Sequence, residues 1–248
     1  MPRGGVRVES GARRVRAFVG GHAVVDTTSP LLVWETPYYP TYYLDMSEFA
    51  DASLIPTGET KRSPSRGEAI VYDVAMNGSK VEAAAYGYEE SPIEDLVGKV
   101  ALVWDKMDHW FEEDDEVYVH PRDPYTRVDV LQSSRHIEVK VDGVTVAEST
   151  KPRLLFETNL PTRYYLPKTD VKFEYLTPTD TATSCPYKGT ARYWSVTVDG
   201  TTHDDVVWGY DTPLRESEQV AGYVCFYNEK VDIYVDGELE QRPKTKFS

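Results

Sequence analysis

The densest group of side chains that could do chemistry lies near the middle of the chain, in residues 117–135. Its polar side chains fall within ten positions, and two prolines stiffen the backbone between them. They are His120, Arg122, Asp123, Tyr125, Arg127 and Asp129. The arginines could hold a carboxylate or a phosphate through paired N–H groups, and the histidine could transfer a proton near neutral pH. Alternatively, the arginines and aspartates form a salt-bridged clasp that docks neighbouring domains.

Cys185 is a second candidate for chemistry because it opens the sequence CPYKG, with Lys188 three residues later. A nearby cation stabilises the thiolate, which is the nucleophilic form of a cysteine. The alternative is a small buried hydrophobic residue, which is also what Cys225 in GYVCFY is expected to be. Two cysteines make neither a disulfide framework nor a zinc site, so no metal and no cofactor is predicted.

Two carboxylates stand inside apolar runs, Glu35 in LLVWET and Glu157 in LLFET. Burial would leave such a group protonated unless it is hydrogen-bonded or paired. One interpretation places both at the floor of a functional pocket. The other gives them internal hydrogen bonds to backbone amides or to the tyrosines that follow, which are Tyr42, Tyr43, Tyr164 and Tyr165.

Aromatic residues are frequent in the chain, and 18 of them are tyrosines. Those that could line a pocket are Tyr193, Trp194, Trp208 and Tyr210, with Tyr72, Tyr86 and Tyr88 as earlier counterparts. Aromatic walls with a few polar groups are typical of small-molecule sites, whereas core packing is the alternative for each single ring. Because a tyrosine hydroxyl needs water or a partner, the excess of tyrosine favours a lined cavity.

These candidates must be positioned by a duplicated chain. Residues 14–74 align with residues 136–196 without a gap, and 18 of the 61 positions are identical. The paired blocks are PLLVWETPYYPTYYL with PRLLFETNLPTRYYL, SPSRGEAIVYDV with CPYKGTARYWSV, YGYEESP with WGYDTP, and GKVALVWDKMD with GYVCFYNEKVD. We therefore expect a tail (residues 1–13), a first repeat domain (14–116), a structured connector (117–135) and a second repeat domain (136–248).

Within each copy the hydrophobic period is two, which is typical of strands. Gly20-Gly21 and Asp142-Gly143 each separate two alternating runs, as in a β-hairpin. Helical periodicity is almost absent, and only residues 46–50 and 92–97 could form short helical turns. The acidic run EEDDE (residues 112–116) is expected to be a solvated turn. The fold class is mainly β, with two antiparallel domains of about seven to nine strands each.

Charge and hydropathy exclude several classes of function. The net charge of −14 opposes binding to nucleic acid or to an anionic membrane, because both need a basic surface. No apolar run approaches the roughly 18 residues that span a bilayer. The first residues lack the apolar core of a signal peptide. We expect a cytoplasmic protein, monomeric or homodimeric, whose partner is a small molecule.

The repeated blocks ET…YYLP…D, CPYKG…YW, WGY…P and GYVCFY…VD, over about residues 14–240, resemble the bacterial and fungal family known as domain of unknown function 427. HPRDPYTRVDVLQSSRH looks like the linker of its two-domain members. The resemblance implies two tandem β-tent domains of the Mss4-like fold, related by a pseudo-twofold repeat. The family sometimes carries a nucleotidyltransferase label, but that chemistry needs a Gly-Ser turn followed by paired aspartates, and Gly78-Ser79 has none after it.

The leading hypothesis is that the chain binds a small anionic or aromatic metabolite near the connector. The expected ligand-binding residues are His120, Arg122, Asp123, Tyr125, Arg127, Glu157, Tyr164, Lys188, Trp194 and Trp208. An alternative is a hydrolytic or thiol-dependent enzyme that uses Cys185 or His120. A third is a non-catalytic interaction or scaffold module.

Overall fold

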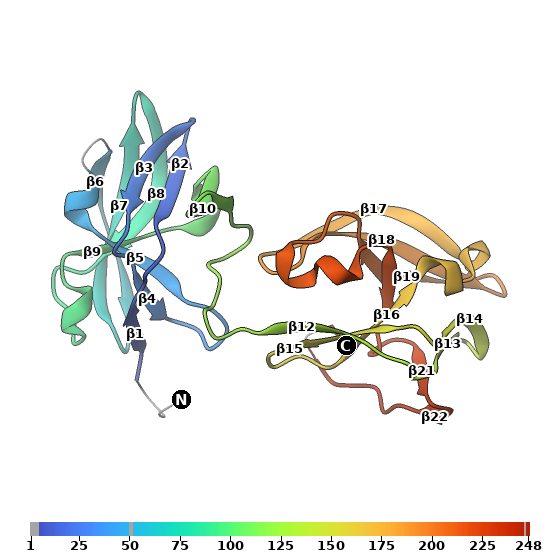
Figure 1. The fold of residues 1–248 in the computed structure, drawn as a ribbon. Helices are drawn as coiled ribbons and strands as arrows, with labels where there is room; N and C mark the ends of the chain where they lie inside the picture. Colours follow the sequence, from blue (N-terminus) through green and yellow to red (C-terminus); the bar gives the residue numbers. More distant parts are fainter. Residues whose placement is uncertain (1–4, 50–51, 246) are drawn as a thin grey trace. The chain divides into compact units, whose positions relative to one another are not determined.

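The structure of the protein, a computed structural model, describes residues 5–49, 52–245 and 247–248 (Figure 1). The chain divides into two compact units, Met1–Asp123 (unit 1) and Pro124–Ser248 (unit 2). In its described residues each unit has one seven-stranded and one four-stranded sheet, and the strands within these sheets pair in antiparallel fashion. The mainly β fold class and the tandem organisation are therefore confirmed.

The first strand of unit 1 lies at one edge of the large sheet, and strands from later in the chain lie beside it. In spatial order the large sheet contains β1 (Arg7–Ser10), β4 (Leu31–Trp34), β5 (Thr41–Asp45), β9 (Lys99–Leu102), β8 (Ser79–Gly87), β7 (Gly67–Met76) and β6 (Ser53–Ser63). The small sheet contains β11 (Asp115–Glu116), β10 (His109–Glu112), β2 (Val15–Val19) and β3 (His22–Thr27). The described residues of unit 1 also form three short 3-10 helices between strands: η1 (Met46–Glu48), η2 (Glu94–Leu96) and η3 (Trp104–Lys106).

Unit 2 repeats this strand order. Its large sheet contains β12 (Val128–Gln132), β15 (Arg153–Glu157), β16 (Arg163–Pro167), β20 (Tyr223–Phe226), β19 (Thr201–Tyr210), β18 (Gly189–Val198) and β17 (Leu176–Cys185). Its small sheet contains β14 (Val144–Ser149), β13 (Ile137–Val141), β21 (Asp232–Val235) and β22 (Glu238–Leu239). The 3-10 helices are η4 (Lys168–Asp170), η5 (Phe173–Tyr175) and η6 (Arg215–Val220). The Mss4-like and pseudo-twofold assignments stay predictions.

The hairpin at the start of each repeat follows from its turn residues. Gly20 and Gly21 have φ of 58° and 79°, and Asp142 and Gly143 have φ of 49° and 83°. Two successive positive φ angles match the right-handed twist of the strands on either side. Glycine and aspartate adopt this conformation more readily than branched residues do. These turns fix the register in which β2 pairs with β3 and β13 with β14.

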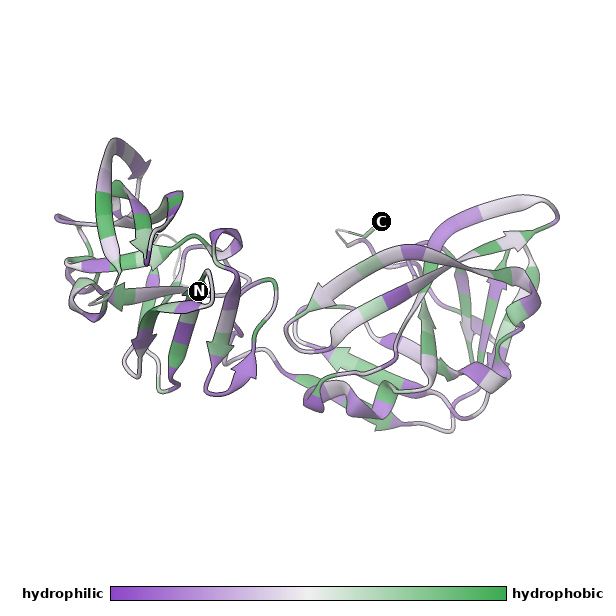
Figure 2. Cartoon of the chain, turned by 90° about the horizontal axis from the view of Figure 1, so that it is seen from above, coloured by the Kyte–Doolittle hydropathy of each residue, from purple (hydrophilic) through white to green (hydrophobic). Residues whose placement is uncertain are grey.

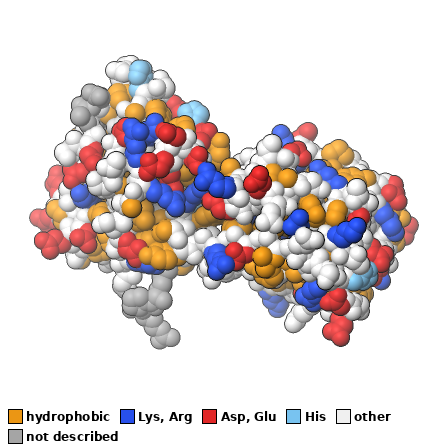
Figure 3. All heavy atoms as spheres, viewed as in Figure 1, with side chains coloured by type: hydrophobic (Ala, Val, Ile, Leu, Met, Phe, Trp, Pro, Cys, Tyr) orange, Lys and Arg blue, Asp and Glu red, His pale blue; other side chains and the backbone are white. Residues whose placement is uncertain are grey.

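Each large sheet separates two hydrophobic cores. In unit 1 the larger core lies between the two sheets, where β2 and β3 face β5, β7 and β9. The smaller core covers the opposite face of the large sheet and contains Tyr43, Tyr86 and Tyr88. Unit 2 has the same two cores, with Tyr165 and Trp208 in the smaller one. In Figure 2 the hydrophobic residues gather on the strands of both units. On the face seen in Figure 3, acidic and basic side chains are interspersed.

The ends of the repeats differ from the expected boundaries. Strand β1 lies inside the expected tail and pairs with β4, and β12 lies inside the expected connector and pairs with β15. Both strands carry valines that pack on the smaller core of their unit. Each unit therefore has eleven strands in the described residues rather than seven to nine. None of the described helices has the length and the hydropathy needed to cross a membrane.

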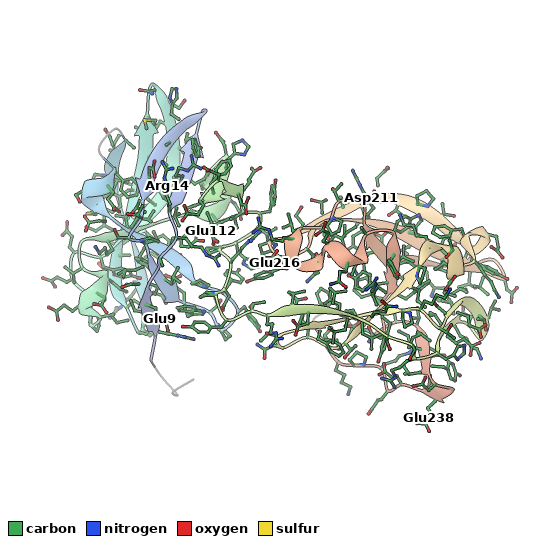
Figure 4. The ribbon with its side chains drawn as sticks, in the orientation of Figure 1. Glu9, Arg14, Glu112, Asp211, Glu216 and Glu238 are labelled. Atoms are coloured by element: carbon green, nitrogen blue, oxygen red, sulfur yellow. The ribbon has the colours of Figure 1, made fainter. Side chains whose placement is uncertain are left out.

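The acidic run at residues 112–116 is only partly the solvated turn that was expected. Glu113 and Asp114 are exposed and form the turn between β10 and β11. Glu112, labelled in Figure 4, is only 6% exposed at the end of β10. Its carboxylate accepts hydrogen bonds from the Tyr42 hydroxyl and from Arg13. The expectation was wrong for this residue because the strand alternation turns its side chain inward.

The outermost strands β6 and β17 are long and interrupted at equivalent places. The register of β6 on β7 shifts between Pro56 and Thr60, and that of β17 on β18 shifts between Pro178 and Ala182. Proline cannot donate a backbone hydrogen bond, so it is tolerated in a sheet at edges and bulges. The duplicated prolines therefore mark the outer edge of each large sheet.

A glycine on β8 and its counterpart on β19 permit close contact between strands. A Cβ on Gly87 would lie 2.7 Å from the carbonyl oxygen of Lys99, and one on Gly209 would lie 2.8 Å from that of Tyr223.

We predict that Gly87→Ala and Gly209→Ala each lower the free energy of unfolding by about 1–3 kcal/mol, because backbone atoms must move. Gly5→Ala is the control, since no atom lies within 4 Å of its added Cβ. Urea unfolding followed by tryptophan fluorescence measures the difference; equal values for the three variants would contradict the prediction.

Candidate ligand-binding site

The expected connector residues are divided between the two units. His120, Arg122 and Asp123 belong to unit 1, and Tyr125 and Arg127 belong to unit 2. Arg122 is half-buried, whereas Tyr125 is 55% exposed. The predicted site is therefore described separately for each unit.

Local contacts explain the positions of the charged connector residues. The carboxylate of Asp123 accepts a hydrogen bond of 2.9 Å from the indole nitrogen of Trp34. Arg127 forms an ion pair with Asp129 at 2.8 Å, and its side chain is 80% exposed. The backbone of Arg127 also exchanges hydrogen bonds with Thr158 in the same unit. An exposed pair of this kind contributes little to stability.

His120 lies in the wall of a pocket in unit 1. Its imidazole stacks on Tyr39, with ring centroids 3.8 Å apart and planes 8° from parallel. Its Nδ1 donates to the carbonyl oxygen of Pro121 at 2.8 Å, which defines the tautomer. Both rings line a cavity of about 280 Å³. We call this cavity the ring pocket, and its aromatic lining residues are Tyr39, Tyr42, Tyr86, Trp104, Trp110 and His120.

The rings of this pocket are held by contacts with one another. Trp104 stacks on Trp110 with centroids 4.6 Å apart and planes 3° from parallel. The indole nitrogen of Trp110 donates to the carbonyl oxygen of Trp104 at 3.1 Å, which closes the turn after η3. The hydroxyl of Tyr42 is bound to Glu112. These interactions hold the planes of the rings.

A buried polar cluster adjoins the ring pocket through Tyr86. The hydroxyl of Tyr86 donates to the carboxylate of Glu35 at 3.2 Å, and the hydroxyl of Tyr43 donates to it at 2.5 Å. Arg66 lies 3.5 Å from Glu35 and also donates to the hydroxyl of Tyr88. Burial, together with the charge of Glu35, raises the pKa of Tyr86, so its hydroxyl keeps its proton at neutral pH. This arrangement corresponds to the internal hydrogen-bond alternative for Glu35.

Unit 2 has an equivalent cluster with different members. The ammonium of Lys188 binds the carboxylate of Glu157, and both side chains are largely buried. The indole nitrogen of Trp208 donates to the hydroxyl of Tyr165 at 3.1 Å. The charge of Lys188, which the thiol hypothesis assigned to Cys185, is thus paired with a carboxylate. In the described residues, no group of three or more His, Cys, Asp or Glu side chains is placed to hold a metal ion.

Two of the expected site residues lie on the other face of the large sheet. Trp194 packs against the core between the sheets, whereas its neighbour Tyr193 is in the smaller core. Tyr164 also faces the larger core and donates its hydroxyl to Glu240. Successive residues of a strand point to opposite faces. Tyr193 and Trp194 therefore belong to different cores, and their joint role in lining a pocket stays a prediction.

Unit 2 contains a buried ion pair that the sequence did not predict. Arg163 and Glu229 form two hydrogen bonds, of 2.6 Å and 2.8 Å, in the arrangement of a guanidinium facing a carboxylate. Burial alone would raise the pKa of Glu229, but the hydrogen bonds from Arg163 and Thr245 outweigh it and lower that pKa. The sequence signal was weak, because 66 residues separate the two partners.

The ion pair generates a stability prediction. We expect Glu229→Gln to lower the free energy of unfolding by about 3–5 kcal/mol, because Arg163 then stays buried without its carboxylate. The double variant Arg163→Met, Glu229→Gln should cost clearly less than the sum of the single variants. Urea unfolding at pH 7 provides the three values. A single-variant cost below about 1 kcal/mol would contradict the prediction.

The same pair has a defined pH dependence. The pKa of Glu229 is lower in the folded than in the unfolded protein. Its contribution to the free energy of unfolding is therefore complete above the ordinary carboxyl pKa of about 4.3. The contribution is lost as the pH falls from there through the folded value. The difference in the free energy of unfolding between the wild-type protein and Glu229→Gln, measured with urea, should therefore become smaller at acidic pH.

The two cysteines are expected to differ in reactivity. Cys225 is fully buried, and burial raises its pKa to about 12. Cys185 is half-buried at the end of β17. Iodoacetamide at pH 8 should therefore label Cys185 in the folded protein while Cys225 reacts only after unfolding. Peptide mass spectrometry with and without urea measures both rates, and Cys185→Ser is the control. Comparable labelling of both thiols in the folded state would contradict the expectation.

Comparison with known proteins agrees with the architecture. No curated protein matches the sequence of the chain. The family described as Domain of unknown function (DUF427) matches it twice, at residues 7–113 and 129–237. The two matches begin in β1 and β12, the first strands of the two units. The chain therefore belongs to this family of unknown function, as a member with two tandem copies of the domain.

Proposed function

We propose that unit 1 binds a small metabolite that carries a flat ring, and that the ring pocket is its site. The observation that carries the proposal is a cavity of about 280 Å³ whose lining contains six aromatic side chains and one lysine, Lys61. Small-molecule sites in proteins are concave, mostly apolar and largely preformed, with a few polar groups for orientation. The volume is close to the lower end of the usual range, so the ligand is small.

The arrangement of the rings supports a flat ligand. Stacked and edge-to-face contacts between rings add to the free energy gained by removing apolar surface from water. Trp104 and Tyr39 are both half-buried, each backed by a stacked ring, and so keep surface for a further contact. His120 is the one residue of the expected ligand-binding set that lines this pocket.

The proposal is tested by replacing one ring of the pocket. We expect Trp104→Leu to weaken the binding of a ring-containing ligand about tenfold, because stacking and apolar contact are lost. Ligands are found by a thermal-shift screen of ring-containing metabolites, and isothermal titration calorimetry then gives Kd for each variant.

Trp194→Leu is the matched control, since Trp194 is also a half-buried tryptophan but lies in unit 2 against the larger core. It should leave Kd unchanged. The proposal is contradicted if the two variants affect Kd equally, or if Trp104→Leu has no effect.

A further inference from the structure

The ring pocket of unit 1 has a counterpart in unit 2 at the same place in the fold. The backbone N–H of Val103 donates to Ala84, and that of Tyr227 donates to Val206, at equivalent points after β9 and β20. The residues that follow therefore correspond, so that Asp105 is equivalent to Glu229. On the neighbouring strand, Thr41 pairs with Val33 as Arg163 pairs with Leu155.

In unit 2 this place is filled by the protein itself. The guanidinium of Arg163 lies 5.5 Å from the ring centre of Trp208 and 5.7 Å from that of Tyr227. The carboxylate of Glu229 binds it with two hydrogen bonds. The hydroxyl of Thr245 donates to the same carboxylate at 2.6 Å. A cation, a carboxylate and aromatic rings thus form one closed group.

In unit 1 the equivalent place holds aromatic rings, a cation and the exposed carboxylate of Asp105, which forms no ion pair with that cation. Thr41 is too short to fill the space that Arg163 fills, and both Thr41 and Asp105 line the ring pocket. The cation over the equivalent ring is Lys61 of β6, whose ammonium lies 4.5 Å from the ring centre of Tyr86. In unit 2 the position of Lys61 is occupied by Thr183, which bonds to the hydroxyl of Tyr193.

The cation of unit 1 is not matched by a carboxylate of its own. Lys61 makes no ion pair with any residue that the structure describes, and Asp105 is exposed in the pocket wall. We infer that the ring pocket takes an aromatic carboxylate, whose acid group pairs with Lys61 as Glu229 pairs with Arg163 in unit 2. A chain then binds one ligand, because unit 2 fills the equivalent place with its own side chains. This inference rests on the proposed function of the ring pocket.

The charges of the lining favour a carboxylate over a phosphate. A phosphate group carries up to two negative charges, and proteins typically recognise it with an arginine fork or with several donors. The ring pocket offers a single ammonium and also contains the carboxylate of Asp105. A group with one negative charge, attached to a flat ring, fits this lining.

The first test compares three probes of one shape, which are 2-naphthoate, 2-naphthamide and 2-naphthylmethylamine. Calorimetry should show 2-naphthoate binding about fivefold more tightly than the amide, as expected for one partly exposed ion pair, and the preference should weaken at high salt. Lys61→Met should abolish the preference. The control is Lys140→Met, because Lys140 also lies 4.5 Å from a tyrosine ring, that of Tyr234 in unit 2.

The second test fills the ring pocket with a side chain of the protein itself. Thr41→Arg introduces into unit 1 the side chain that unit 2 has, and it should reduce the binding of all three probes more than tenfold. Thr202→Arg adds the same charge at an exposed position of β19 in unit 2 and should leave binding unchanged. In the wild-type protein the stoichiometry should be one probe per chain.

The outcomes separate the inference from the proposed function. If the amide or the amine binds as tightly as the acid while Trp104→Leu still weakens binding, the carboxylate assignment is overturned and the ring site stands. Two probes per chain would overturn the statement that unit 2 is filled. If none of the probes binds at millimolar concentration and the metabolite screen is also silent, the proposed function fails with it.

Discussion

The structure depends on burying two adjacent tyrosines in the middle of each large sheet. Tyr42 and Tyr43 point to opposite faces, as do Tyr164 and Tyr165, because a strand alternates its side chains. All four rings are nearly inaccessible, so each hydroxyl must find a partner inside the protein. The partners are Glu112, Glu35, Glu240 and Trp208. Elements far apart in the chain are thereby fixed around one central strand.

Much of the fold could be read from the sequence because its determinants are local. Alternation of apolar residues gave the strands, Gly20-Gly21 and Asp142-Gly143 gave the hairpins, and the duplication gave two units. The edge strands β1 and β12 were missed because each pairs on one side only and leaves a weak pattern. The pairing of Arg163 with Glu229 could not be foreseen, since nothing in the sequence indicates which of the many acidic residues it meets.

The candidate site was foreseen only in part, for the same reason. His120 was singled out, but the rings around it come from four separate stretches of the chain, and each alone is typical of core packing. The comparison of the two units supplies what the sequence lacked. Where Arg163 and its carboxylate close one unit, Thr41 leaves space in the other. Duplication allows the two copies to differ at this place, because one copy can change while the other keeps its buried ion pair.

The interrupted edge strands have a consequence for how molecules of this protein meet. A long, regular edge strand offers unpaired backbone groups to any similar edge, which is a route to aggregation. In β6 and β17 the bulge after Pro56 and Pro178 bends the strand, and proline removes a donor. A second chain cannot continue such a sheet in register. The duplicated prolines thus make the β6 and β17 edges poor templates for pairing with another strand.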